Sequence, residues 1–162
     1  MQYPFPMLKR ILLGTLVVGS LDICEVIIFY GFRDVSAIRI LQSVARGWLG
    51  NKAFSGGIPA ALLGLASHFF IAFGLVTVYY VASRRLELLR RWPVLMGAIY
   101  GLGVFIVMNY IVLPNTKAGM ANFTTVTLIN QFFCHIFLIG IPAALITTSR
   151  MRTDEVRADF SG

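Results

Sequence analysis

The stretch FFIAFGLVTVYYVA, residues 69–82, has no charged side chain and no alternation of polar with apolar residues. A membrane-crossing β-strand would alternate over about ten residues, so this stretch predicts a helix. The apolar run around it covers residues 58–82, long enough to cross a hydrocarbon core about 30 Å thick at about 1.5 Å per residue. Three more runs have a comparable length: residues 11–31, 94–113 and 124–149.

The composition also indicates a membrane protein. Of the 162 residues, 57% are hydrophobic and only 13% are charged, which is too apolar for an ordinary soluble domain. We therefore expect one integral membrane domain over residues 1–162, an all-α bundle of four transmembrane helices in up-down order. The lipid bilayer is its expected partner, with a homo-oligomer or a larger membrane complex as a further expectation.

Basic residues are distributed unevenly between the two sides of such a chain. One side carries nine of them: Lys9, Arg10, Arg84, Arg85, Arg90, Arg91, Arg150, Arg152 and Arg157. The other side carries five: Arg33, Arg39, Arg46, Lys52 and Lys117. Because basic residues gather on the cytoplasmic side, both termini are expected there, including a tail over residues 150–162. The net charge of +7 is then explained by membrane topology and by attraction to anionic lipids. No motif for binding the grooves of a nucleic acid occurs, so no nucleic-acid partner is expected.

The N-terminal run allows a second interpretation. A basic pair, an apolar stretch and a Val-Gly-Ser triplet over residues 9–20 loosely resemble a cleavable signal. The apolar run resumes at Val26, however, so we expect a first membrane span.

The segment of residues 33–57 connects the first two spans and has helical periodicity. Its apolar residues, Trp48 among them, recur every three or four positions. Polar residues occupy much of the other surface: Arg39, Gln42, Ser43 and Arg46. This pattern predicts an amphipathic helix on the outer membrane face, broken near Gly47 and Gly50.

Polar side chains within the apolar runs are the best indication of function, because they are costly in hydrocarbon. Seven of them stand out: Asp22, Glu25, His68, Asn109, Asn130, Gln131 and His135. Counted from the outer end of each span at about 1.5 Å per residue, all lie between the outer interface and the midplane. We therefore predict one polar cluster in the outer half of the bundle. The cysteines of these runs, Cys24 and Cys134, are interpreted as small apolar fillers.

Small residues mark the faces on which the helices are expected to pack. Gly64 lies four residues before His68, and Gly97 and Gly101 form a GxxxG pair in the third span. In the fourth span, Pro142 is expected to cause a kink or to free a carbonyl.

The polar cluster is compatible with four roles. Its members can bind one another and stabilise the bundle, or they can form a path for protons, ions or a small solute. His68 and His135 lie at similar depth, as two axial ligands of a b-type haem would, and imidazole with carboxylate also suits a divalent metal. No catalytic motif occurs, so we expect no enzymatic activity, no resident cofactor, and a membrane-embedded binding or accessory component.

Three stretches carry a resemblance to a known group of proteins. They are GSLDICEVIIFYGFRDVSAIRILQSVARGWLG (residues 19–50), SHFFIAFGLVTVYYVASRR (67–85) and GAIYGLGVFIVMNYIVLP (97–114). The chain resembles small four-span inner-membrane proteins of bacteria in its Asp22, its Arg39 to Gln42 segment, its His68 and its Asn109. The group has no assigned activity, so the resemblance implies only location in the cytoplasmic membrane and topology.

Overall fold

In the computed structural model, residues 5–120 and 122–149 are described, and every regular element among them is a helix. Four helices are long and apolar enough to cross a membrane: Met7–Gly31, Gly57–Arg85, Pro93–Asn115 and Thr125–Ser149. The predicted all-α four-helix bundle is therefore confirmed, with span ends close to those expected. The predicted tail, residues 150–162, lies outside the described residues.

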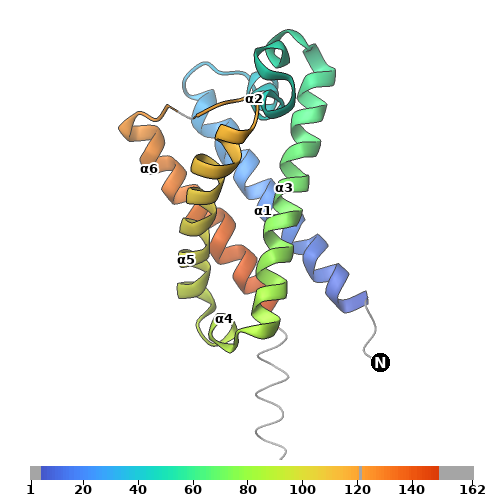
Figure 1. Cartoon of the computed structure of the whole chain (residues 1–162), viewed down its shortest axis with the longest axis vertical. Helices are drawn as coiled ribbons and strands as arrows, with labels where there is room; N and C mark the ends of the chain where they lie inside the picture. The colour runs from blue at the N-terminus through green and yellow to red at the C-terminus, as the bar shows by residue number, and fades with distance from the viewer. Residues whose placement is uncertain (1–4, 121, 150–162) are drawn as a thin grey trace, which may run out of the picture.

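Two short helices join the spans at opposite ends of the bundle. The first span is α1 (Phe5–Gly31), followed by α2 (Ala37–Leu49) and the 3-10 helix η1 (Gly50–Ser55). The second span is α3 (Gly57–Arg85), and α4 (Glu87–Arg91) connects it to the third. Figure 1 shows α2 at one end of the molecule, the α2 end, and α4 at the opposite end, the α4 end.

The third and fourth spans each contain a wide helical turn. The third runs through α5 (Pro93–Ile106), the π-helical η2 (Val107–Val112) and the 3-10 helix η3 (Leu113–Asn115). The fourth runs through α6 (Thr125–Phe133), the π-helical η4 (Cys134–Gly140) and a last helical stretch ending at Ser149. In η4, the amide of Ile141 donates to the carbonyl of Ile136, five residues earlier. This turn directly precedes Pro142, which lacks the amide that would bond the carbonyl of Leu138.

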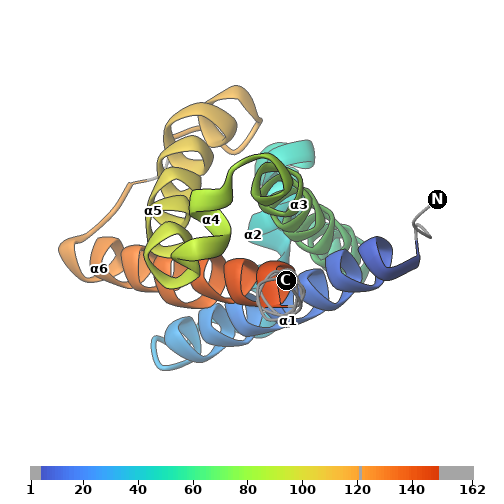
Figure 2. The ribbon, with the colours of Figure 1, turned by 90° about the horizontal axis from the view of Figure 1, so that it is seen from below.

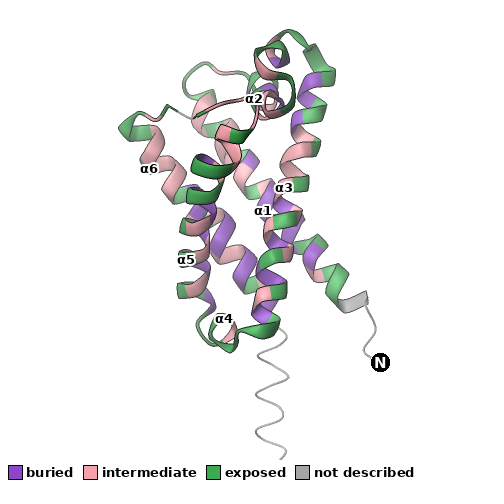
Figure 3. Cartoon of the chain, in the orientation of Figure 1, coloured by how far each residue is buried: buried purple, intermediate pink, exposed green. Residues whose placement is uncertain are grey.

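The core lies where α1 crosses α3 and the fourth span (Figure 2). Its fully packed members come from these three helices: Ile11, Val18, Val76, Tyr80, Ile139 and Ala143. Figure 3 shows exposed residues on the outward faces of the helices, and Leu16, for example, is 59% exposed. An apolar outward surface of this kind is what a bilayer would cover.

Glycine allows close contact between the third and fourth spans. A β-carbon added at Gly97 would lie 2.8 Å from the carbonyl oxygen of Gly140, and one at Gly101 would overlap the carbonyl oxygen of His135. The GxxxG pair therefore lies on a helix contact, as its pattern predicts. Gly64 likewise allows α3 to approach α2 closely, because a β-carbon at Gly64 would overlap the carbonyl oxygen of Leu41.

Helix α2 is anchored on both sides. Ser36 caps its start by accepting a hydrogen bond from the amide of Arg39. At the other end, the connection between the third and fourth spans packs against it: the amide of Lys117 donates to the carbonyl of Gly47, at 3.1 Å. Arg46 donates through Nη2 to the carbonyl of Ala118, at 3.0 Å. These contacts hold α2 across the end of the bundle.

Two details of the predicted amphipathic segment are wrong. The helix is not broken at Gly47 but continues to Leu49. The hydrogen bond that the Gly47 carbonyl accepts from the Lys117 amide offsets the cost of about 1 kcal/mol for a glycine inside a helix. Gly50, with φ of 61°, ends it. Gln42 is 5% exposed rather than on an outward polar surface, because α2 crosses the start of α3 and Gln42 donates to the carbonyl of Gly57.

Candidate functional site

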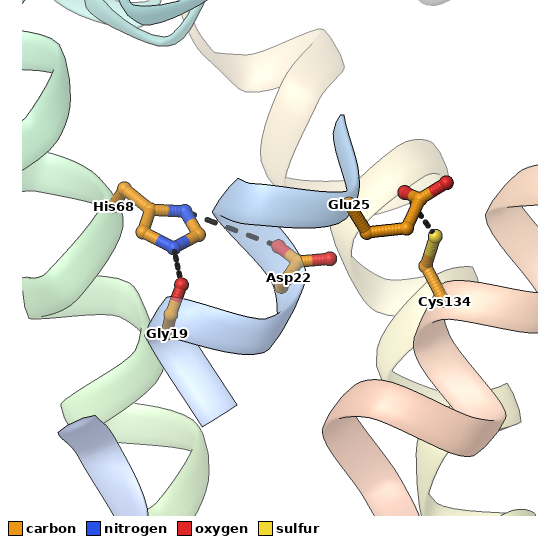
Figure 4. Close-up of polar contacts among 5 residues, drawn as sticks. All are labelled: Gly19, Asp22, Glu25, His68 and Cys134. Carbon is orange, nitrogen blue, oxygen red and sulfur yellow. Dashed lines mark hydrogen bonds and ion pairs between the residues drawn. The ribbon is translucent and has the colours of Figure 1, made fainter. Parts of the chain in front are cut away.

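The first part of the candidate site lies at the crossing of α1 and α3. Gly19 makes the crossing close, since a β-carbon there would lie 2.6 Å from the ring of Phe69. The imidazole of His68 bonds through Nε2 to the carbonyl oxygen of Gly19, at 2.8 Å (Figure 4). Its Nδ1 lies 3.9 Å from Oδ2 of Asp22. Both side chains are largely covered, at 13% exposure for His68 and 20% for Asp22.

The Gly19 contact fixes how His68 carries its protons. A carbonyl oxygen only accepts, so Nε2 must hold a hydrogen and donate it. In a neutral imidazole Nδ1 is then bare, and it carries a proton only in the imidazolium form. Asp22 faces this Nδ1. The pair can therefore exist as imidazolium with carboxylate, or as neutral imidazole with carboxylic acid, and both forms hold one shared proton.

The second part of the site joins α1 to the fourth span. Oε2 of Glu25 accepts a hydrogen bond from the Sγ of Cys134, at 2.8 Å, and a longer one from Nδ2 of Asn130, at 3.4 Å. The Asn130 amide also contacts the Cys134 sulfur, at 3.7 Å. Glu25 follows Asp22 by one helical turn, and in Figure 4 the two carboxylates point toward different neighbouring helices.

His135 lies beside these groups on the fourth span. It is 8% exposed, and its Nδ1 donates to the carbonyl of Gln131, at 2.8 Å. Its ring meets Phe105 of α5 edge-on, with ring centroids 5.5 Å apart. Asp22 lies within electrostatic range of both histidines and of Glu25. Within residues 5–120 and 122–149, the recorded partners of both carboxylates are thus an imidazole, a thiol and an amide, with no lysine or arginine among them.

Two predicted members do not reach the carboxylates. Asn109 is buried in η2, but its amide donates to the carbonyl of Phe105 in its own helix, at 2.9 Å. Gln131 contributes its main-chain carbonyl, to His135, and its side chain has no recorded contact with either carboxylate. The depth of each residue was predicted from its position along its span, but the direction in which each helix faces decides what the side chains contact.

The four residues singled out in the outer segment serve to hold α2. The guanidinium of Arg39 lies over the ring of Phe54, 4.3 Å from its centroid, and Arg46 reaches the following connection as described above. Trp48 donates through Nε1 to Oγ of Ser67, next to His68, at 3.0 Å. With Gln42 bonded to α3, these contacts connect the segment to the helix that carries His68.

Cys134 and Gly19 are the members of the site that the sequence did not assign to it. Cys134, interpreted as an apolar filler, is buried and bonded to Glu25. Its position four residues after Asn130 places the two on one helical face, a signal that was present in the sequence. The carbonyl of Gly19 belongs to the main chain and gives no such signal.

The geometry does not suit the haem hypothesis. A haem-ligating histidine presents one ring nitrogen to iron, but His68 uses Nε2 for Gly19 and turns Nδ1 to Asp22. In the part of the chain that the structure describes, no three histidine, cysteine, aspartate or glutamate residues are grouped so as to hold a metal ion.

Comparison with known proteins identifies no relative: no family model, curated protein or solved structure matches this chain. The resemblance to small four-span bacterial proteins therefore stays a prediction. The function has to be inferred from the chemistry of the site.

Proposed function

We propose that this protein is a non-enzymatic binding component of the bacterial cytoplasmic membrane, with both termini in the cytoplasm, and that its polar cluster binds protons. We expect it to act in a homo-oligomer or a larger membrane complex. The orientation rests on the excess of lysine and arginine on the side that carries the termini.

The observation that carries the proposal is the Asp22–His68 pair. Its distance of 3.9 Å is too long for a direct hydrogen bond but suits an ion pair, and the Gly19 contact leaves only Nδ1 to gain or lose a proton toward Asp22. A carboxylate within a membrane span is costly unless it is neutralised. Since no lysine or arginine is among the partners of Asp22 and Glu25 within residues 5–120 and 122–149, protonation of a histidine or of a carboxyl group is what neutralises this cluster.

Proton transport is the second candidate, and the position of Glu25 favours it. Glu25 lies one helical turn from Asp22 and contacts the fourth span, whereas Asp22 faces α3. Two carboxylates and two histidines in one region are the usual parts of a proton relay. A relay also needs access from both sides of the membrane, so flux separates this candidate from simple binding.

Proton uptake after a pH jump, measured on purified protein in detergent, tests the proposal. We expect Asp22→Asn to change the number of protons taken up between pH 8 and pH 4, a range chosen to span the ordinary titration of histidine and carboxylates. Asn109→Ala is the matched control and should leave the number unchanged, because an amide does not titrate in this range and this one donates to the carbonyl of Phe105 in its own helix. An unchanged number in Asp22→Asn would contradict proton binding by the pair.

The same variants in liposomes distinguish the two candidates. A binding component should give no proton flux above that of empty liposomes. Flux that disappears in Asp22→Asn and persists in Asn109→Ala would instead favour transport.

A further inference from the structure

A groove at the α4 end of the bundle lies apart from the polar cluster. It has a volume of about 440 Å³ and is lined by Arg10 and Leu13 of α1 and by Leu145, Ile146 and Ser149 of the fourth span. Volumes of this size are typical of small-molecule sites. The two helices meet here, and Arg10 donates through Nη1 to the carbonyl of Thr147, at 3.4 Å.

The lining of the groove is polar at the ends of the two spans and apolar about one helical turn further in. Arg10 is in the first turn of the span Met7–Gly31, and Ser149 is the last residue of the span Thr125–Ser149. Leu13 and Leu145 lie about one turn further into their spans, and both remain exposed, at 54% and 38%. In a bilayer, the charged level would face lipid headgroups and the leucines would face acyl chains.

Arg10 gives the groove a preference for negative charge. A guanidinium has five N–H donors in a planar fork, so one bond to the Thr147 carbonyl leaves capacity for the oxygens of a phosphate. None of the described residues that line the groove is acidic. The bond to Thr147 also restricts where the guanidinium lies, at the rim above the apolar wall.

We propose that this groove binds an anionic phospholipid, with its phosphate on Arg10 and an acyl chain along Leu13, Leu145 and Ile146. Charge complementarity selects the headgroup, and the apolar wall selects a lipid over a soluble anion. Basic pockets between membrane helices are known to bind acidic lipid headgroups.

Native mass spectrometry of the detergent-purified chain with added phosphatidylglycerol or phosphatidylcholine tests this proposal. We expect one phosphatidylglycerol to be retained in preference to phosphatidylcholine. Arg10→Gln should weaken that binding about tenfold or more, as for a lost hydrogen bond to a charged group. Arg91→Gln removes the same charge from an exposed position at the same end and should cost no more than about fivefold.

A second variant keeps the test valid if Arg10→Gln folds poorly. Leu145→Trp fills the groove from a half-exposed position and should reduce phosphatidylglycerol retention while leaving Arg10 in place. Equal retention of both lipids, or retention unchanged in both variants, would overturn the proposal.

Discussion

Gly101→Val should destabilise the protein by about 3 kcal/mol, the upper end of the range for overpacking a helix contact. A β-carbon at Gly101 would overlap the carbonyl oxygen of His135 and lie 2.9 Å from the Cα of Ile136. Both are main-chain atoms, which cannot rotate away as a side chain can. The third and fourth spans would have to separate, and His135 would move with its helix.

Gly103→Val is the matched control for this prediction. Gly103 lies in the same helix two residues later, and a β-carbon there would meet nothing within 4 Å. The intrinsic helix preference changes equally in the two variants, so their difference isolates the contact. The free energy of unfolding in mixed detergent micelles, followed by circular dichroism, measures it. Equal stability of the two variants would contradict the close packing of the spans at Gly101.

His68→Leu should destabilise the protein by about 1–3 kcal/mol, because it leaves the carboxyl group of Asp22 without its imidazole partner. Asp22→Asn alone removes the same pair from the other side. In a double-mutant cycle, the two changes should therefore be non-additive by about 1 kcal/mol, within the range found for contacting residues and for polar pairs between membrane helices.

Asn109→Ala combined with Asp22→Asn provides the control cycle. Asn109 was predicted to belong to the same polar cluster, yet its amide donates to the carbonyl of Phe105 in its own helix. We expect these two changes to add to within about 0.5 kcal/mol, as for residues without a shared partner. Additivity in the His68 cycle as well would show that the pair does not contribute to stability.

The four spans and their contacts through glycine could be predicted because they depend on hydropathy and on residue size. Long apolar runs need helices to satisfy their main chain in a membrane, and Gly101 marks a place where a larger residue does not fit. These features follow from the composition of each helix alone.

The partners within the site could not be predicted in the same way. Rise per residue gives the depth of Asn109 and Gln131, but the rotation of each helix about its axis decides what they face. The π-helical turns η2 and η4 change that rotation within the third and fourth spans, and Asn109 and Cys134 lie in them. Gln42 was misplaced for a related reason, since α3 covers a residue that the pattern of α2 assigns to an outward surface.

Nitrogen-15 NMR of the histidine-labelled protein in lipid bilayers tests the shared proton of Asp22 and His68 most directly. We expect the neutral form of His68 to carry its hydrogen on Nε2, bonded to Gly19, and to leave Nδ1 without a hydrogen on the side that faces Asp22. Asp22→Asn should alter the Nδ1 signal of His68 and leave Nε2 protonated. A neutral His68 protonated on Nδ1, or an Nδ1 signal unaffected by Asp22→Asn, would contradict the proposed proton site.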